Sequence, residues 1–271
     1  MTFTHLLFAD DSLFFFQTDK NSLHNLRSTI HWYCSISGQC INFNKSELCC
    51  SPNIPQADQE SLTLFLQVNL VQNPNKYLGL NFKLRGRRVS DFQDIIDKVH
   101  HKLQGWKAKL LSQAGRTTLI SSVLQAMPLY TFSCMRVPET VYNKLDAIVR
   151  SFWWGHNMGD KKLHLLNWEK ICQPRERGGL GLKKFNLINQ AMIAKQFWRI
   201  QHYLNSLLAR TYKAKYFPRT FLQDYKPKSH HSWTRKNIAT PQSTLLHQGR
   251  WIIGSGYQVP LSHPHWFQTS H

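Results

Sequence analysis

Apolar residues near the start of the chain form two short runs with acidic residues between them. The runs cover residues 3–8 and 12–16, and Asp10 and Asp11 stand between them. Two strand-like runs around a short polar break predict a β-hairpin with a tight acidic turn. The aromatic residues at 14–16 would then have exposed faces unless other segments cover them.

The rest of the first 82 residues mixes helical and extended patterns. Apolar residues recur at helical spacing from Leu23 to Tyr33, and Gly38 stands where that helix should end. Shorter apolar runs predict strands over 41–43, 48–50 and 77–80, and a short helix over 57–66. Residues 1–82 are therefore expected to mix α and β structure.

From residue 90 the apolar period becomes that of amphipathic helices. The expected helices cover residues 92–106, residues 113–127 and a segment that begins at Pro138. Residues 90–93 match a capping box before the first helix, and Pro128 should end the second. These helices predict a small bundle over residues 90–154, with their apolar stripes as its core.

The remaining chain is less regular. Residues 155–185 are rich in loop formers, and two further helices are expected over 186–203 and 206–216. The glycine-rich run 177–181 lacks the Gly-Lys-Ser/Thr ending of a phosphate-binding loop, so it is interpreted as a turn. The segment after residue 216 is aromatic and basic, which suggests short strands or a partial domain.

Targeting signals are weak. No apolar stretch reaches the length of a membrane span, and the first apolar run is interrupted by two aspartates, which makes it a poor signal peptide. The six cysteines contain no Cys-x-x-Cys pair, which favours buried thiols in a reducing compartment. An intracellular protein without a membrane segment is expected, and nothing distinguishes nucleus from organelle.

The charge of the chain is strongly basic. It has 34 lysines and arginines against 15 acidic residues, a net charge of +19. From Arg177 to the end there are 14 basic residues and one acidic residue, Asp224. Such an excess suggests a polyanionic partner, most often nucleic acid, although a solvated basic surface is the alternative.

Basic residues also accompany the expected helical bundle. Those on or beside its helices are Lys98, Lys102, Lys107, Lys109 and Arg116. With the apolar stripes turned inward, these side chains would form a basic outer face suited to backbone phosphates. An ordinary solvated helix face explains them equally well.

The acidic turn suggests a specific chemistry. Neighbouring aspartates held at a rigid turn repel each other, so a bound cation relieves their electrostatic repulsion. Mg²⁺ prefers oxygen ligands and takes one or two carboxylates from a protein. Nucleotide addition by two Mg²⁺ ions uses carboxylates in this way. Asp-Asp pairs are common in turns, but here apolar strands flank the pair on both sides.

The sequence Phe-Ala-Asp-Asp at residues 8–11 resembles the third catalytic motif of reverse transcriptases, in the form found in plant LINE-type (non-long-terminal-repeat) retrotransposons. Further segments resemble the later motifs of that family in the same order: 38–46, 76–80, 103–107, 111–116, Trp168, Pro174, 178–181, 189–191, 195–199 and 215–218. The resemblance covers nearly the whole chain.

The resemblance implies an RNA-directed DNA polymerase of the α+β class. It implies a partial palm of short antiparallel strands and helices over residues 1–82. A mainly α-helical thumb-like segment over 90–154 and a basic connector with an incomplete C-terminal region over 155–271 would follow. Such an enzyme transfers nucleotides with Mg²⁺ and binds an RNA template and a DNA primer. Its oligomeric state is not implied.

The resemblance also implies roles for individual residues. Asp10 would be the main metal ligand of this motif and Asp11 its partner. Lys45 would be a candidate for protonating or steering the leaving pyrophosphate, although an ordinary surface lysine is the alternative. The turn at Gly79 would approach the primer backbone.

One departure from the family affects the expected activity. A complete palm takes another aspartate from a strand upstream of the acidic turn, and fingers hold the template, whereas nine residues precede Asp10 here. The chain is therefore expected to be inactive alone. The alternatives are a basic nucleic-acid-binding module without catalysis and a decayed transposon reading frame with no selected role. Residues 90–154 are expected to be the most autonomous part.

Overall fold

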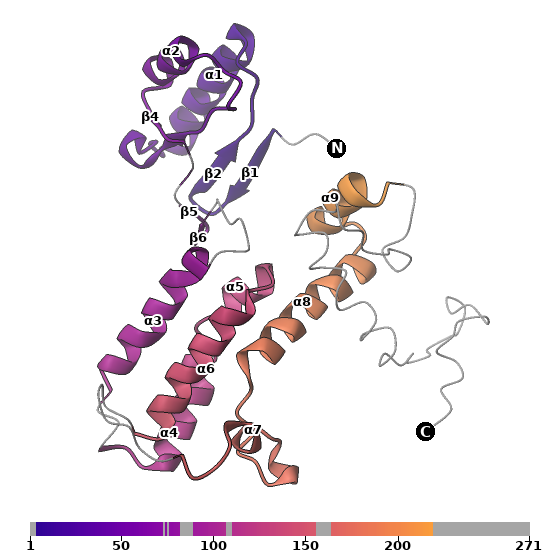
Figure 1. Ribbon diagram of the computed structural model, residues 1–271. Coiled ribbons are helices and arrows are strands. Elements are labelled where there is room, and N and C mark those ends of the chain that lie inside the picture. The colour runs from indigo at the N-terminus through magenta and orange to yellow at the C-terminus, as the bar shows by residue number, and fades with distance from the viewer. Residues whose placement is uncertain are drawn as a thin grey trace, which may run out of the picture. The chain divides into compact units, whose positions relative to one another are not determined.

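The computed structural model describes residues 4–72, 74, 76–81, 89–106, 110–155 and 164–218 (Figure 1). It is mainly helical with a few short strands, in agreement with the expected α+β class. The chain divides into two compact units, Met1–Arg85 and Gly86–His271. The palm, thumb and connector identities stay predictions, and the segment expected to form strands after residue 218 lies outside the described residues.

The elements of the first unit are, in chain order, β1 His5–Phe8, β2 Asp11–Phe14, α1 Lys20–Ser37, η1 Phe43–Lys45, β3 Glu47–Leu48, α2 Gln56–Leu66, β4 Asn69–Leu70, β5 Lys76–Tyr77 and β6 Leu80–Asn81. The predicted helices at α1 and α2 are confirmed. Asp19 caps α1 by accepting a hydrogen bond from the Ser22 backbone N–H at 2.8 Å. Gly38 ends α1 in the left-handed conformation, as its position predicted.

The strands of this unit form separate pairs. β1 pairs with β2 and β5 with β6 in antiparallel hairpins, whereas β3 and β4 run parallel, which corrects the expectation of antiparallel strands alone. The strand predicted over 41–43 is wrong, because the Asn42 side chain accepts a hydrogen bond from the Lys45 backbone N–H and starts the 3₁₀ turn η1. The run 77–80 is a hairpin, not one strand.

The first unit has a small core. Leu23 of α1, Leu48 of β3 and Leu62 of α2 are its buried apolar side chains among the described residues. Phe16 is half-buried against this cluster. Phe14 and Phe15 remain 37% and 44% exposed, so the expected exposure of residues 14–16 is confirmed for two of the three.

The second unit contains η2 Val89–Phe92, α3 Gln93–Gln104, α4 Gln113–Leu119, the π-helical turn η4 Ile120–Leu124, α5 Leu129–Cys134, α6 Glu139–Trp153, α7 Trp168–Ile171, η5 Arg175–Arg177, α8 Phe185–His202 and α9 Leu207–Tyr216. Ser90 does not cap α3, because residues 89–92 form a 3₁₀ turn before it. Pro128 follows the end of η4 as predicted, but its carbonyl accepts from Phe132 N–H and begins a further short helix, α5.

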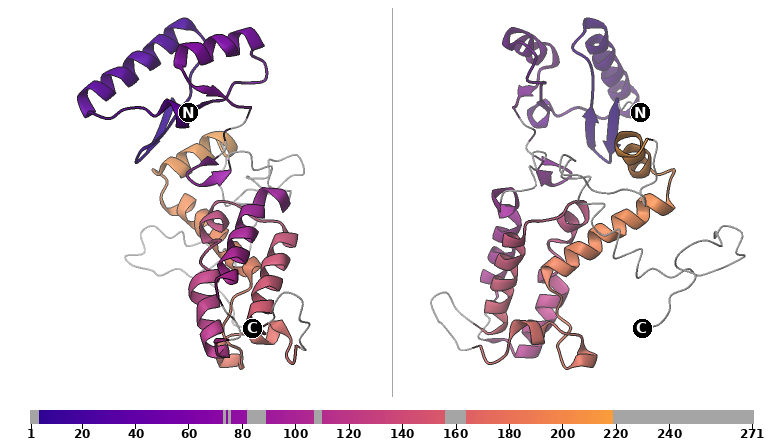
Figure 2. Two further views of the ribbon diagram at one scale, coloured as in Figure 1. Left: turned by 90° about the vertical axis from the view of Figure 1, so that its left-hand side faces the viewer. Right: turned by 45° about the vertical axis from the view of Figure 1, so that its right-hand side comes forward.

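Most helices of the second unit pack around a bundle core, and the far end of α8 forms a separate small cluster with α9. α3 lies beside α6, α4 also packs on α6, and α8 packs across α5 and α6 (Figure 1, Figure 2). Buried side chains of α3, α5, α6 and α8 contribute to the bundle core, including Val99, Leu145 and Phe185, and the Phe185 ring lies edge-on to Phe132 of α5 with 6.2 Å between ring centres. The expected bundle over 90–154 therefore gains α8, a helix from beyond its expected end.

A buried asparagine joins α8 to its neighbours. Asn189 is fully buried and donates hydrogen bonds to the carbonyl oxygens of Phe132 at 2.7 Å and Met135 at 2.8 Å. Its side-chain oxygen accepts from the Val137 N–H at 3.1 Å and from the Tyr142 hydroxyl. Burial raises the pKa of Tyr142 to about 12, so its hydroxyl remains a donor. The amide is satisfied on both sides and fixes the α5–α6 connection against α8.

The glycine-rich run is a turn, as predicted. Gly178 has φ +77°, and a Cβ added at Gly179 would lie 2.0 Å from the carbonyl oxygen of Gln173. Gly179 N–H donates to the Pro174 carbonyl at 3.1 Å. The close approach of two backbone segments therefore requires glycine here, and no phosphate-binding role is needed to explain it. In the described part of the chain, no helix is long and apolar enough to cross a membrane.

Candidate functional site

The acidic turn is the tip of the β1–β2 hairpin. Phe8 pairs with Asp11, so Ala9 and Asp10 form a two-residue loop and Asp11 is the first residue of β2. The φ angle of Ala9 is +50°, whereas the φ angle of Asp10 is not positive. Positive φ at the first loop residue alone is the pattern of a type II′ turn, whose twist matches the strands. An alanine is uncommon there, so the tip holds some backbone strain.

Both carboxylates of the tip are exposed. Asp10 and Asp11 are adjacent in sequence and lie on the solvent-accessible end of the hairpin. Among the described residues, no group of three or more histidine, cysteine, aspartate or glutamate side chains is arranged to hold a metal ion. The donor set at the tip is thus two carboxylates, which fits the number that Mg²⁺ usually takes from a protein.

The other predicted catalytic residue lies on η1. Lys45 is exposed, and its backbone N–H is bonded to Asn42. Within the described ranges its ammonium forms no ion pair with Asp10 or Asp11. The structure therefore does not bring Lys45 into contact with the acidic tip, and its role in pyrophosphate release stays a prediction.

Gly79 lies at the tip of the second hairpin. Leu78 and Gly79 connect β5 to β6 with φ +50° and φ +76°. Positive φ at both loop residues is the pattern of a type I′ turn, which explains the glycine. Gly79 is exposed, and a Cβ there would meet no atom within 4 Å. The turn is open to a ligand backbone, and its contact with a primer stays a prediction.

The basic residues predicted on the bundle have different surroundings. Lys98 and Lys102 lie exposed on α3, whose buried residues are Ile96 and Val99. The Lys102 ammonium is 6.0 Å from the centre of the Trp106 ring, and that ring packs against Phe152 at 5.6 Å. Trp106 is accordingly part of the bundle. Lys107 and Lys109 lie outside the described residues.

Arg116 stabilises the C-terminal end of α6. Its guanidinium Nη1 donates a hydrogen bond to the Trp153 carbonyl at 2.9 Å, at the end of α6. A Cβ at Gly155 would lie 2.6 Å from the same nitrogen, so the chain leaves α6 tightly around the guanidinium. A cation at a helix C-terminus stabilises the unpaired carbonyl groups there. Sequence reasoning placed Arg116 among phosphate contacts and did not reveal this bond.

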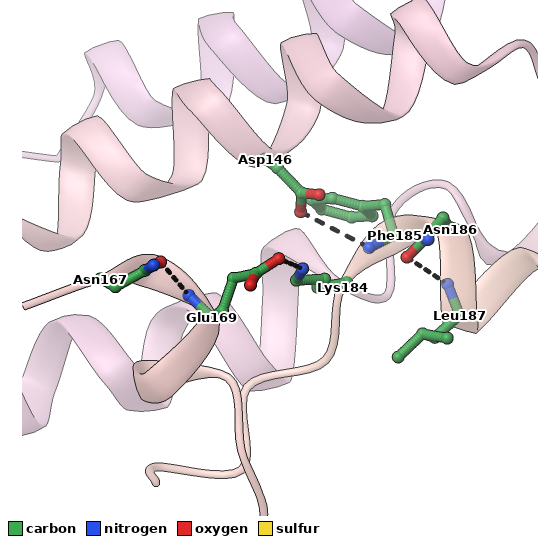
Figure 3. A network of polar contacts seen from close by, with 7 residues as sticks. All are labelled: Asp146, Asn167, Glu169, Lys184, Phe185, Asn186 and Leu187. Atoms are coloured by element: carbon green, nitrogen blue, oxygen red, sulfur yellow. Dashed lines mark hydrogen bonds and ion pairs between the residues drawn. The ribbon is translucent and has the colours of Figure 1, made fainter.

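A polar cavity between α6, α7 and the start of α8 was not predicted. Its volume is about 440 Å³, and its lining includes Asp146 and Arg150 of α6, Glu169 of α7 and Lys184. Glu169 accepts from the Lys184 ammonium at 2.5 Å, and Asp146 accepts from the Phe185 N–H at 3.5 Å (Figure 3). The ion pair lowers the pKa of Glu169.

Asp146 is the perturbed group of this cavity. Burial raises the pKa of Asp146 to about 6, against the smaller lowering effects of the Phe185 N–H, Lys184 and Arg150. One hint of this group was present in the sequence, because Asp146 directly follows the core residue Leu145 on an amphipathic helix. The partners come from segments about 20 to 40 residues away, so spacing along the chain could not identify them.

Comparison with known proteins gives two relatives of interest. No known protein-family profile matches the chain. It is 35% identical over 179 residues to "Putative ribonuclease H protein At1g65750" of Arabidopsis thaliana, a match that covers 65% of this chain and 29% of that protein. The chain thus spans less than a third of that relative.

The second relative is shorter. The chain is 30% identical over 142 residues to "Uncharacterized mitochondrial protein AtMg00310" of Arabidopsis thaliana, a match that covers 52% of this chain and 92% of that protein. Because the similarity extends along almost all of that protein, the chain belongs to the family of the uncharacterized mitochondrial protein AtMg00310.

Proposed function

We propose that the chain is part of an RNA-directed DNA polymerase that descends from a plant non-long-terminal-repeat retrotransposon. The hairpin register carries this proposal, because the Phe8–Asp11 pair leaves Ala9 and Asp10 as the loop and keeps both carboxylates exposed. The sequence around this tip has the reverse-transcriptase form, and the relatives are plant proteins.

The carboxylate oxygens of Asp10 and Asp11 would hold Mg²⁺. When bound, this ion would activate a primer 3′-hydroxyl and balance the charge of the incoming triphosphate. The residues of the chain itself present the two acceptors at the tip of the hairpin and leave them open to solvent. The Gly79 turn supplies a second exposed backbone corner in the same unit, where a Cβ would meet no atom within 4 Å and a primer strand would have room to approach.

Metal binding at the tip tests the proposal. Water-proton relaxation with Mn²⁺ in place of Mg²⁺ is expected to show a weak site that Asp10→Asn/Asp11→Asn removes. Asp58→Asn/Glu60→Gln is the matched control, because it neutralises two exposed carboxylates of α2 in the same unit. Equal Mn²⁺ binding by wild type and the Asp10/Asp11 variant would contradict the assignment of the tip.

Primer extension tests catalysis separately. We expect no extension of an oligo(dT) primer on poly(rA) with Mg²⁺, because the described residues supply two carboxylates at the tip and no third. Extension that disappears in Asp10→Asn would show that the chain completes a polymerase site, and the expected inactivity would then be wrong.

A second candidate function is nucleic-acid binding without catalysis. The observation that favours it is the absence of acidic residues from α8 and α9, which carry lysines, arginines and an exposed tryptophan. Mobility shifts with RNA and DNA are expected to show binding that weakens steeply with salt, because phosphate contacts release counterions. No binding at low ionic strength would exclude this function and favour a decayed reading frame.

A further inference from the structure

One face of α8 combines cations with an exposed aromatic ring. Lys195, Trp198, Arg199 and His202 follow each other at spacings of three, one and three residues, which places them on the same side of a helix. All four side chains are exposed, and Trp198 keeps 48% of its surface accessible. The buried residues of this helix end, such as Phe197, lie on other positions and pack toward α9.

The two rings of this face are stacked on each other. The Trp198 and His202 ring centres are 3.8 Å apart, and their planes differ by 21°. The His202 Nδ1 atom also lies 3.0 Å from the Trp198 carbonyl oxygen, within hydrogen-bond distance. Because the helix backbone holds both rings, the platform exists before any ligand arrives, and little ordering is needed on binding.

The cations of this face are available to a ligand. The Arg199 guanidinium donates only a long hydrogen bond of 3.4 Å to the Gln196 side chain. Neither Lys195 nor Arg199 forms an ion pair with a carboxylate of the described residues. The sequence has no acidic residue between Glu176 and Asp224, so the charged side chains of α8 and α9 are all basic.

We infer that this face of α8 binds single-stranded nucleic acid. A base stacks on the Trp198–His202 platform, and Lys195 and Arg199 contact the phosphates on either side. Aromatic stacking with flanking cations is how proteins hold single strands without reading their sequence. A duplex fits less well, because its bases are already stacked on each other. The inference rests on the proposed nucleic-acid binding and names its site.

The first unit offers a matched comparison for the tryptophan. Trp32 is also exposed on a helix, at 65% of its surface. Its neighbours three and four positions away are Ser28, Thr29, Ser35 and Ile36, none of which is charged. Exposure of the ring is thus common to both sites, and the combination with cations is particular to Trp198.

Fluorescence anisotropy of the full chain with labelled (dT)₁₂, (rU)₁₂ and a 12-base-pair duplex tests the inference. Trp198→Ala is expected to weaken binding of single strands about tenfold, within the usual effect of losing one stacked base. Trp198→Phe should retain most of the affinity, and Trp32→Ala should leave it unchanged. The relative affinities for the two single strands decide whether RNA or DNA is preferred.

The charges are tested in the same assay. Lys195→Gln/Arg199→Gln is expected to reduce the slope of log affinity against log salt by about 1.4, from two lost phosphate contacts. Lys144→Gln/Lys170→Gln removes the same charge from exposed positions outside α8 and should keep the slope. If Trp198→Ala binds single strands like wild type, the inferred stacking on Trp198 and His202 is wrong, while the proposed nucleic-acid binding still holds. If wild type binds no nucleic acid, the proposed binding function fails as well.

Discussion

The two units of the chain bury very different amounts of apolar side chain. Among the described residues, three buried apolar side chains lie in Met1–Arg85 and 24 lie in Gly86–His271. Of the 20 exposed large apolar side chains among the described residues, half belong to the shorter first unit. The segment with the candidate metal ligands therefore has the smaller core, and the segment without them has the larger one.

The difference has a structural origin. The strands of the first unit form separate two-stranded pairs, and a two-stranded sheet is marginally stable in water unless something packs against it. Several helices of the second unit, α3 and α6 above all, offer a long apolar face, so a few of them enclose a common core. We conclude that the candidate catalytic hairpin depends on further contacts for its stability far more than the helical unit does.

Limited proteolysis tests the difference in stability between the two units most directly. With thermolysin, which does not depend on basic residues, the first cleavages are expected within residues 1–82, because a region with few buried contacts opens locally at low free energy. The helical segment 90–154 should survive much longer. Protection of residues 1–82 in place of 90–154, detected by mass spectrometry of the fragments, would contradict the comparison.

The buried asparagine is expected to have the largest single-residue effect on stability. Asn189→Leu should lower the free energy of unfolding of the second unit by about 3 kcal/mol, because it leaves the Phe132 and Met135 carbonyls and the Val137 N–H without partners. Urea unfolding followed by circular dichroism measures it. Gln190→Ala, at the exposed neighbouring position, is the control and should change stability by less than about 0.5 kcal/mol.

The raised pKa of Asp146 predicts a pH dependence of the second unit. Burial raises the pKa of Asp146 from 3.8 to about 6, so the folded state binds the proton more tightly than the unfolded state. Stability should therefore be highest below pH 3.8 for this group and fall as the pH rises to about 6.

The substitution Asp146→Asn tests whether Asp146 causes this pH dependence. Asp146→Asn should remove the fall between pH 3.8 and 6 and be about 1–2 kcal/mol more stable than wild type at pH 7, since partial exposure screens the full shift. Asp97→Asn, on the exposed side of α3, should keep the wild-type profile. Thermal unfolding across this pH range measures both, and identical profiles for Asp146→Asn and wild type would exclude Asp146 as the cause.

The smallest expected effect concerns the backbone strain at Ala9 in the β1–β2 hairpin. Ala9→Gly should stabilise the β1–β2 hairpin by about 0.5–1 kcal/mol, because glycine adopts the φ of +50° without the clash of a Cβ. Hydrogen exchange of the β1 and β2 amides measures it. Ala57→Gly in α2 should instead destabilise its helix by a similar amount. A faster exchange in Ala9→Gly would argue against strain at the tip.

Local patterns predicted the local elements well. The helices α1, α2, α3, α6, α8 and α9 follow from apolar residues at i, i+3 and i+4, and the hairpin follows from two apolar runs around Asp10 and Asp11. The stop at Gly38 and the turn at residues 178–181 were also predictable. Each of these features depends on residues a few positions apart, which the sequence displays directly.

Features that join distant segments required the tertiary structure. The packing of α8 on α5 and α6, the parallel pairing of β3 with β4, and the bond from Arg116 to the Trp153 carbonyl connect residues roughly 20 to 60 positions apart. The four hydrogen bonds of Asn189 and the raised pKa of Asp146 depend on burial, which several segments create together. Apolar periodicity shows which face a helix buries, but the partner depends on how the side chains of all the segments fit in three dimensions.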